Sequence, residues 1–258
     1  MNQLTENLKN LTTENINVNN KQCDILFILG SGASVDSGLP TYRGPAGIYK
    51  DEFDPEKYFS NLNINNDIDK VWDYFRPLLK ASINATPGPT YNIMKKIIDK
   101  FPKSAIITQN VDGLAYKMID NIPLVEIHGN NRRMKCMHKK CEKIHDININ
   151  KPFCECGYWC RPDITCYGEM LDIKKMTDCY KVSKKFYKYV IVIGTTIQFS
   201  YLKEFIKNAK RRFAKVIHIN PDDSYEYHIK KNERWIKDIS LTGLTQFYDE
   251  IINDTNQL

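Results

Sequence analysis

Apolar positions in this 258-residue chain form short runs separated by stretches with helical spacing. The first run, 23–30, ends in glycine, the pattern of a buried parallel strand. Further runs of this kind lie at 104–108, 124–127, 189–194, 215–220 and 239–241, and helical spacing marks 71–81, 90–100, 202–213 and 244–252. Strands that alternate with helices predict an α/β fold, with a mostly parallel sheet covered by helices on both faces.

Composition narrows the class of protein. Hydrophobic residues make up 42% and charged residues 26% of the chain, which is ordinary for a soluble globular protein. No apolar run approaches the ~18 residues of a membrane span, and the start does not read as a secretory signal. Residues 1–22 are rich in Asn and Thr and are expected to form a polar tail. We therefore expect an intracellular protein without a membrane partner, in the cytoplasm or the nucleus.

The formal charge of +6 raises the question of a nucleic-acid surface. Basic residues cluster at 184–188 and 207–212. Aromatic residues do not interleave regularly with these charges, so the pattern favours a solvated helix face over direct nucleic-acid binding.

Ligands of parallel sheets bind at the carboxyl ends of the strands, so the loops after the predicted strands are the place to look for chemistry. Gly30 and Gly32 follow the first strand and allow the backbone to approach a pyrophosphate, which the following amides can cradle. Val35 occupies the third glycine position of the full dinucleotide fingerprint. Arg43 adds a cation close to the expected position of phosphates or a ribose.

Polar residues also follow the later strands. Gln109, Asn110 and Asp112 can hold hydroxyls and a carboxamide, or they serve as turn and helix-cap residues. His128 at a strand end has a side chain suited to a general base, although a lone histidine is more often structural. The fourth and fifth strands end in Gly194-Thr195-Thr196 and in Asn220-Pro221. Polar loops after five successive strands are what a dinucleotide site requires.

Six short motifs occur in one order along the chain: GSGAS with SGLPTYRG, TQNVDGL, EIHG, RPDITCYGE, GTT and INP. In order and spacing they resemble the signature of the sirtuins, over roughly 23–220. The resemblance implies a Rossmann-like large domain at about 23–46, 86–130 and 165–258, within a catalytic domain spanning 23–258. It also implies a small domain made of a helical module at about 47–85 and a zinc ribbon at about 131–164. The implied function is NAD-dependent deacylation of protein lysines.

Six of the eight cysteines crowd into residues 136–166, which in a chain without export signals favours a metal site in a reducing compartment. Cys136-x4-Cys141 and Cys154-x-Cys156 fit one structural zinc ion held by four thiolates, with no position left for a catalytic water. The family's commoner first position of the second pair is Phe153 here, so Cys160 or His138 remains an alternative ligand.

The resemblance also implies a chemistry and a role for individual residues. The acyl-lysine oxygen is joined to the nicotinamide ribose carbon, nicotinamide leaves, and a base activates a ribose hydroxyl, giving free lysine and 2′-O-acyl-ADP-ribose. The matching base is His128, Asn110 matches the residue that positions the ribose and a water, and Asp112 matches the residue that holds the carboxamide. The other matching residues contact the cofactor (Gly30, Ser31, Gly32, Ala33, Tyr42, Arg43, Gln109, Gly194, Thr195, Thr196 and Asn220) or the peptide backbone (Tyr167, Gly168 and Glu169).

The acyl preference follows from the helix near Trp72. Desuccinylating sirtuins carry a Tyr-x-x-Arg pair there, and this chain has Phe75 and Leu78 at those positions. An apolar pair cannot neutralise a buried carboxylate, so acetyl or longer fatty acyl groups are expected rather than succinyl, with Arg76 as a possible exception. Among other departures, Tyr91 replaces a common histidine and indicates altered packing, and Tyr201 stands at a usual proline position.

Two other functions fit the same residues. One is an NAD glycohydrolase or ADP-ribosyltransferase, in which nicotinamide release does not require an acyl-lysine peptide. The other is a non-catalytic NAD- or ADP-ribose-binding module, which the presence of His128, Asn110 and Asp112 together disfavours.

Overall fold

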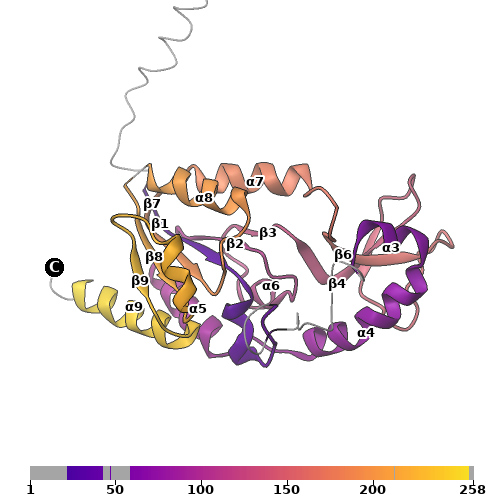
Figure 1. Ribbon diagram of the computed structural model, residues 1–258, viewed down its shortest axis with the longest axis horizontal. Coiled ribbons are helices and arrows are strands. Elements are labelled where there is room, and N and C mark those ends of the chain that lie inside the picture. The colour runs from indigo at the N-terminus through magenta and orange to yellow at the C-terminus, as the bar shows by residue number, and fades with distance from the viewer. Residues whose placement is uncertain (1–21, 43–46, 48–58, 212, 256–258) are drawn as a thin grey trace, which may run out of the picture.

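The computed structural model describes residues 22–42, 47, 59–211 and 213–255 (Figure 1). The elements, in chain order, are β1 (Gln22–Leu29), η2 (Ser31–Ser37), α3 (Asn61–Asn66), α4 (Ile68–Asn84), α5 (Pro89–Lys100), β2 (Ala105–Thr108), α6 (Leu114–Met118), β3 (Leu124–Glu126), β4 (Gly129–Cys136), β5 (Ile144–Asp146), β6 (Cys160–Ile164), α7 (Ile173–Ser183), β7 (Phe186–Ile193), α8 (Ser200–Lys210), β8 (Lys215–Ile219), η3 (Asp223–His228), β9 (Arg234–Ile236) and α9 (Ser240–Thr255).

The larger sheet has the strand order β3-β2-β1-β7-β8-β9, and all its neighbouring strands are parallel. Numbered along the chain, this is the 3-2-1-4-5-6 order of doubly wound nucleotide-binding folds. The strand order reverses between β1 and β7. The loops that follow these two strands therefore flank one crevice at the carboxyl ends of the strands, and their chains then continue to opposite faces of the sheet. The prediction of a parallel α/β sheet is confirmed.

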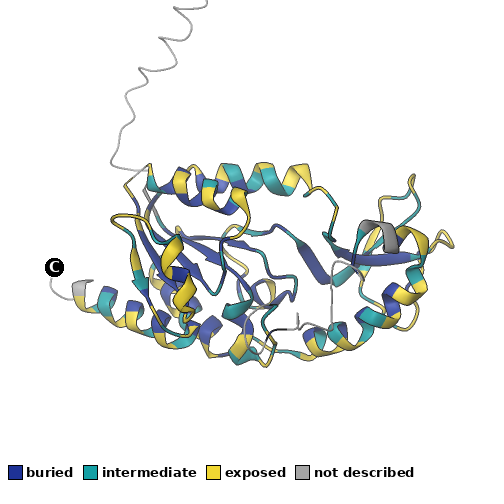
Figure 2. Cartoon of the chain, viewed as in Figure 1, coloured by how far each residue is buried: buried dark blue, intermediate teal, exposed yellow. Residues whose placement is uncertain are grey.

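The apolar run of β1 is buried on both faces of the sheet (Figure 2). Ile25, Phe27 and Leu29 pack with α5, α6 and α9 on one face. Leu26 and Ile28 pack with α7 and α8 on the other face, because successive side chains of a strand point to opposite sides. None of the helices in the described part of the chain has the length and apolar character to cross a membrane.

Two expectations about the elements need correction, and one helix was not expected. The predicted strand at 239–241 is wrong, because α9 begins at Ser240 and the sixth strand is β9. In β9 only Ile236 is buried, so this edge strand lacks a continuous apolar run. Helix α8 ends at Lys210, and Phe213 lies beyond it in an exposed position. Helix α7 was not predicted, since its side chains are largely polar and Cys179 and Val182 are its buried apolar residues.

Beside the large sheet lies a second unit in which β4 pairs antiparallel with β5 and β6 (Figure 1). Helices α3 and α4 pack next to it through an apolar cluster around Trp72 and Phe75. The buried indole of Trp72 donates its Nε1–H to the carbonyl of Cys160 at 2.9 Å. This bond ties the second turn of α4 to the first residue of β6.

Candidate functional site

The loops after β1 and β7 are in direct backbone contact at the crevice. A Cβ atom on Gly32 would lie 2.6 Å from the Cα of Gly194, and one on Gly30 would lie 2.6 Å from the Gly194 carbonyl oxygen. Gly194 itself has φ +58, a conformation that residues with a side chain rarely adopt. Glycine is therefore required at these three positions for the two loops to meet.

Main-chain hydrogen bonds hold this contact in place. Gly30 N–H donates to Ile193 O, Gly32 N–H donates to Gly194 O at 3.0 Å, and Ala33 N–H donates to Gly30 O. A pyrophosphate cradle that used the amides of Gly32 and Ala33 would have to exchange or share these bonds. The direct contribution of the glycines is thus the close approach of the backbone.

A buried cluster of hydrogen-bonded side chains is attached to this contact through the Gly30 carbonyl. Asn110 Nδ2 donates to Gly30 O at 2.9 Å and to Ser34 Oγ at 3.2 Å. Ser34 Oγ donates to Asp112 Oδ2 at 2.7 Å and lies 2.9 Å from the Tyr91 hydroxyl. Burial raises the pKa of Asp112, although the bonds from the Leu114 amide and Ser34 act in the opposite direction. The cluster therefore holds a carboxyl group in an environment that disfavours its charge.

Sequence reasoning missed the roles of two members of this cluster. Ser34 belongs to the glycine-rich motif, which was the available signal, but only the preceding residues were assigned to the site. Tyr91 was interpreted as a packing residue. It is fully buried in the core, and its hydroxyl also bonds to Ser34.

His128 is held at the end of β3 by a bond to each ring nitrogen. Its Nδ1 lies 3.0 Å from the main-chain oxygen of Gln109, and its Nε2 lies 2.6 Å from the hydroxyl of Tyr201. Burial lowers the pKa of His128 to about 4; the Gln109 carbonyl opposes this shift and the Lys175 charge adds to it. The imidazole is consequently neutral at physiological pH, which is the form that can accept a proton.

Side chains after β2, β7 and β8 connect through Thr195. Gln109 Nε2 donates to Thr195 Oγ1 at 2.8 Å, and Asn220 Nδ2 donates to the main-chain oxygen of Thr195 at 3.2 Å. The structure therefore brings together the predicted residues Gln109, Thr195 and Asn220.

Two predicted cofactor residues lie after η2. The Tyr42 amide donates to Ser31 Oγ at 3.4 Å, and burial and the nearby Asp112 carboxylate raise the pKa of the Tyr42 phenol. Arg43 lies outside the described residues.

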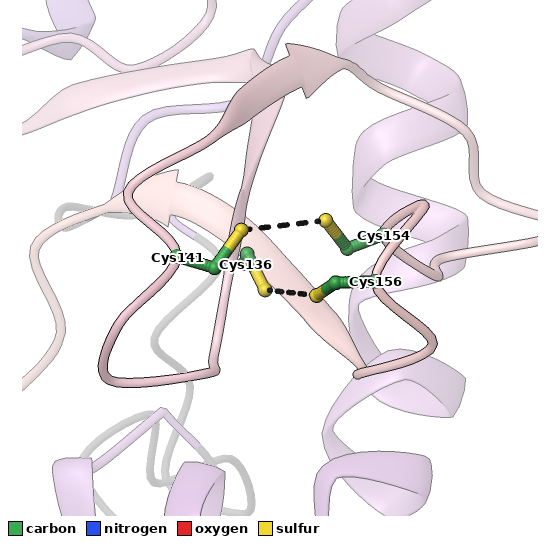
Figure 3. Close-up of side chains that lie close together, drawn as sticks. All are labelled: Cys136, Cys141, Cys154 and Cys156. Atoms are coloured by element: carbon green, nitrogen blue, oxygen red, sulfur yellow. Dashed lines mark hydrogen bonds between the residues drawn. The ribbon is translucent and has the colours of Figure 1, made fainter.

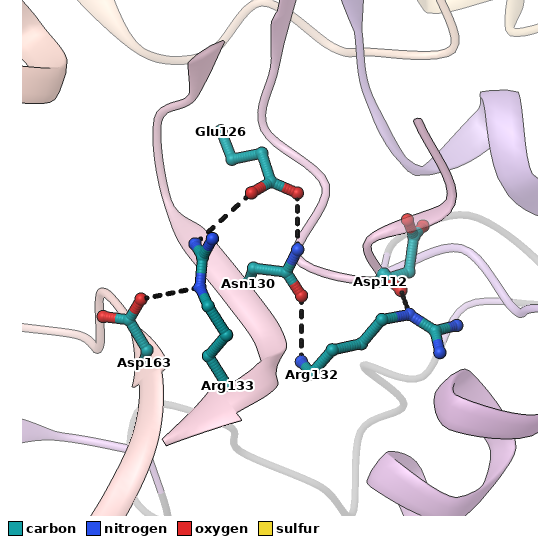
Figure 4. Close-up of polar contacts among 6 residues, drawn as sticks. All are labelled: Asp112, Glu126, Asn130, Arg132, Arg133 and Asp163. Carbon is teal, nitrogen blue, oxygen red and sulfur yellow. Dashed lines mark hydrogen bonds and ion pairs between the residues drawn. The ribbon is translucent and has the colours of Figure 1, made fainter. Parts of the chain in front are cut away.

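A second polar network connects β4 with Asp112, Glu126 and Asp163 (Figure 4). Asn130 donates to Glu126 at 2.7 Å, and Arg133 bridges Glu126 and Asp163 at 3.3 Å each. Arg132 Nε donates to the Asp112 carbonyl at 2.9 Å, and its Nη2 donates to the Ser82 carbonyl in the last turn of α4. Arg132 thereby fixes the Asp112 loop against the small unit. Sequence reasoning assigned no role to these two arginines.

The segment predicted to pair with a peptide lies beside the small unit. The Tyr167 amide donates to Phe59 O at 2.9 Å, so this amide already has a partner in the chain. The Glu169 carboxylate accepts from Arg161 and from the Cys166 amide at 2.8 Å. Glu169 therefore stabilises the turn around Gly168, which has φ +76.

The predicted acyl-pocket residues lie on α4. Phe75 is buried and packs against Phe59 with ring centroids 4.1 Å apart, and Leu78 is partly buried at the edge of the same cluster. Arg76 Nε donates to Ile149 O, and Arg76 pairs with Asp73. The guanidinium is therefore already engaged with neighbouring groups.

The four predicted cysteine ligands converge between the two loops of the ribbon (Figure 3). All four sulfur atoms lie within 4.8 Å of one another; the Cys136–Cys156 pair is 3.5 Å apart and the Cys141–Cys154 pair 3.7 Å. A tetrahedral shell with Zn–S bonds of about 2.3 Å separates its sulfurs by about 3.8 Å. The observed spacing matches that shell.

The two alternative ligands behave differently. Cys160 forms a second group with His145 and Cys154, whose ligand atoms also lie within 4.8 Å of one another. His138 belongs to neither group, and its ring stacks on Tyr158 at 4.2 Å.

Comparison with known proteins agrees with this architecture. The sequence profile of the Sir2 family matches residues 30–200. An NAD-dependent protein deacylase from Aquifex aeolicus (strain VF5) is 29% identical over 230 residues, covering 88% of this chain and 94% of that protein. NAD-dependent protein deacylase 2 from Pseudomonas syringae pv. tomato (strain ATCC BAA-871 / DC3000) is 31% identical, covering 76% of this chain and 84% of that protein.

Solved structures show the same fold. A mutant Sir2 homologue in complex with ADP-ribose superimposes with a TM-score of 0.78 at 23% identity, covering 92% of this chain and 94% of that one. A Sir2 homologue in complex with NAD gives a TM-score of 0.75 at 23% identity, covering 91% and 90%. Fold and site thus define a doubly wound α/β protein with an inserted cysteine-bearing unit. The chain belongs to the Sir2 family.

The lowered pKa of His128 makes the stability of the protein depend on pH. In the unfolded chain this side chain takes up a proton below about pH 6.5, whereas the folded protein resists protonation down to about pH 4. The unfolded state binds more protons over that window, so the free energy of unfolding should fall as the pH falls through it. We expect the difference in unfolding free energy between the unmodified protein and His128→Gln to decline from pH 6.5 to 4.5, as measured by denaturant titration. A difference that is constant with pH would contradict the neutral, buried imidazole.

Proposed function

We propose that this protein is an NAD-dependent protein lysine deacylase that releases nicotinamide, free lysine and 2′-O-acyl-ADP-ribose. The observation that carries the proposal is the neutral imidazole of His128, bonded to Gln109 next to the buried pair Asn110 and Asp112. The names of the Aquifex and Pseudomonas relatives support the same reaction.

The residues present fit NAD. Gly30, Gly32 and Gly194 allow the loops after β1 and β7 to meet at the crevice, and the Asp112 carboxyl is held in a site that disfavours its charge. NAD would supply the ribose carbon that receives the acyl oxygen, with nicotinamide as the leaving group. In this proposal Asn110, whose Nδ2 is already bonded inside the protein, presents its Oδ1 to a ribose hydroxyl or a water.

In this proposal His128 is the general base. Nδ1 carries a hydrogen because its partner, the Gln109 carbonyl oxygen, can only accept. Nε2 therefore carries the lone pair, to which the Tyr201 hydroxyl is bonded, and in this proposal it is the final acceptor of the proton that leaves the attacking ribose hydroxyl. Asp112 would bind the nicotinamide carboxamide, and Gln109, Tyr42, Arg43, Thr195, Thr196 and Asn220 would line the rest of the cofactor site.

Zinc is the metal that suits the cysteine tetrad. Four thiolates at these separations give a closed tetrahedral shell without an open position, which is a structural zinc site. The ion would join the loop before β5 to the loop before β6 and so hold the small sheet together.

The deacylase reaction can be tested with NAD and a panel of acylated lysine peptides, with products identified by mass. We expect peptide-dependent release of nicotinamide together with 2′-O-acyl-ADP-ribose. His128→Ala should lower product formation by roughly 10²-fold or more, because the base is removed, while NAD binding is retained. His228→Ala, a half-buried histidine of η3, is the matched control. Nicotinamide release that does not require an acyl peptide would instead indicate a glycohydrolase.

The zinc assignment makes a separate prediction. The purified protein should contain about one zinc per chain, and chelation should unfold the ribbon before the large domain. Cys156→Ala should lose the metal, whereas Cys179→Ala should keep it, because Cys179 lies in the core against α8. Cys160→Ala decides between the two groups. Loss of zinc from this variant would contradict the assigned tetrad.

The apolar side chains at Phe75 and Leu78 predict the acyl preference. Each buried methylene stabilises binding by about 0.8 kcal/mol, whereas a buried succinyl carboxylate without a partner loses several kcal/mol. We expect kcat/KM for succinyl-lysine at least ~30-fold below that for acetyl-lysine, about 2 kcal/mol in transition-state binding. Phe75→Tyr combined with Leu78→Arg should narrow the gap, and Arg76→Gln should leave it unchanged. Equal activity on both peptides would refute the alignment around Trp72.

A further inference from the structure

Two aromatic side chains at the start of α8 contact the imidazole of His128. Phe199 precedes the helix and stacks on Tyr201, with ring centroids 5.3 Å apart and planes inclined by 11°. The imidazole lies edge-on to both rings, at 5.6 Å from Phe199 and 6.2 Å from Tyr201. This contact fixes the Tyr201 ring beside the histidine.

The hydrogen bond that His128 Nδ1 makes to Gln109 decides which group donates in the bond between Tyr201 and His128. Because Nδ1–H is bonded to the Gln109 carbonyl oxygen, Nε2 is the acceptor nitrogen. The Tyr201 hydroxyl, 2.6 Å away, therefore donates its hydrogen to Nε2. Burial raises the pKa of Tyr201, with the neighbouring Cys179 acting in the same direction, so the phenol keeps this hydrogen.

This bond occupies the only lone pair with which His128 can act as a base. While the bond persists, a substrate hydroxyl reaches the imidazole only through the phenol oxygen. That oxygen still has its two lone pairs, and among the described residues no second partner of the Tyr201 hydroxyl is found. A hydroxyl that both donates and accepts can pass a proton on without holding a net charge.

We propose that Tyr201 is a further catalytic residue, which relays the proton of the attacking ribose hydroxyl to His128. The inference rests on the proposed deacylase function. The ribose O–H bond breaks as its proton bonds to the Tyr201 oxygen, and the original phenol hydrogen moves to Nε2. The freed electron pair of the ribose oxygen would form the bond to the acyl carbon, and the π pair of that carbon's double bond to the lysine nitrogen would move onto the nitrogen. Tyr201 ends neutral and His128 ends as imidazolium, so no further reactant is needed.

The test compares two reactions of Tyr201→Phe, which keeps the ring and removes the hydroxyl. Nicotinamide exchange reports the first step, which needs no base, and formation of 2′-O-acyl-ADP-ribose reports the whole reaction. The relay predicts exchange within about threefold of the unmodified protein, together with product formation at least ~10²-fold lower, the lower end of the range for loss of a proton-transfer group. Tyr201→Ala removes the ring and should recover part of the lost product formation, because the base then becomes directly accessible. Tyr180→Phe, in the same apolar cluster, is the control and should behave like the unmodified protein.

Several results would overturn the proposed relay, and each has a different meaning. Normal or faster product formation by Tyr201→Phe would overturn the relay and identify Tyr201 as a cover over the base. An equal loss of exchange and product formation would also overturn it, since the residue would then act before proton transfer. If Tyr201→Phe does not fold, the single-turnover rate of product formation by the unmodified protein is measured in H2O–D2O mixtures. The relay moves two protons in one step, so the rate should depend on the deuterium fraction along a curve. A straight line would refute the relay. Absence of peptide-dependent nicotinamide release from the unmodified protein overturns the proposed function and the relay together.

Discussion

The contact between the loops after β1 and β7 is the constraint on which the site depends. Gly30, Gly32 and Gly194 bring two main chains so close that a single Cβ atom would collide with backbone. This approach occurs at the reversal of strand order, where the two parallel strands lie side by side while their connections run to opposite faces of the sheet. Asn110 then bonds to the Gly30 carbonyl, and Gln109 bonds to Thr195. The polar side chains are thus built onto a fixed backbone contact.

Buried polar groups around this contact are arranged for chemistry at some cost in stability. The Asp112 carboxyl and the His128 imidazole both lie where burial disfavours their charged forms. A core designed for stability alone would replace such groups with apolar side chains. Their hydrogen bonds to Ser34 and to Gln109 offset part of the desolvation penalty and also set their orientation. Such clusters of groups with shifted pKa values are typical of functional sites.

The small unit is joined to the site by specific polar contacts. Arg132 bonds both to the Asp112 carbonyl and to the carbonyls at the end of α4, and Trp72 links α4 to β6. A cation at a helix C-terminus satisfies carbonyl groups that have no partner within the helix. The helical module, the ribbon and the Asp112 loop therefore keep a common orientation, which the antiparallel pairing of β4 and β6 extends to the cysteine loops.

The sequence by itself determined the α/β class, five of the six strands of the large sheet and the two closely spaced cysteine pairs, although it left Cys160 or His138 open as an alternative ligand. These features follow from local patterns, since a strand buried on both faces reads as one apolar run and cysteine spacing is set by short turns. It did not reveal the edge strand β9 or the helix α7, because few of their side chains are buried. Only the tertiary structure decided that Ser34 and Tyr91 join Asp112, that Arg132 clamps α4, and that Tyr201 reaches His128. The partners in these contacts are between 50 and 78 residues apart in the sequence. No local pattern encodes such distances, because the order of strands in the sheet sets them.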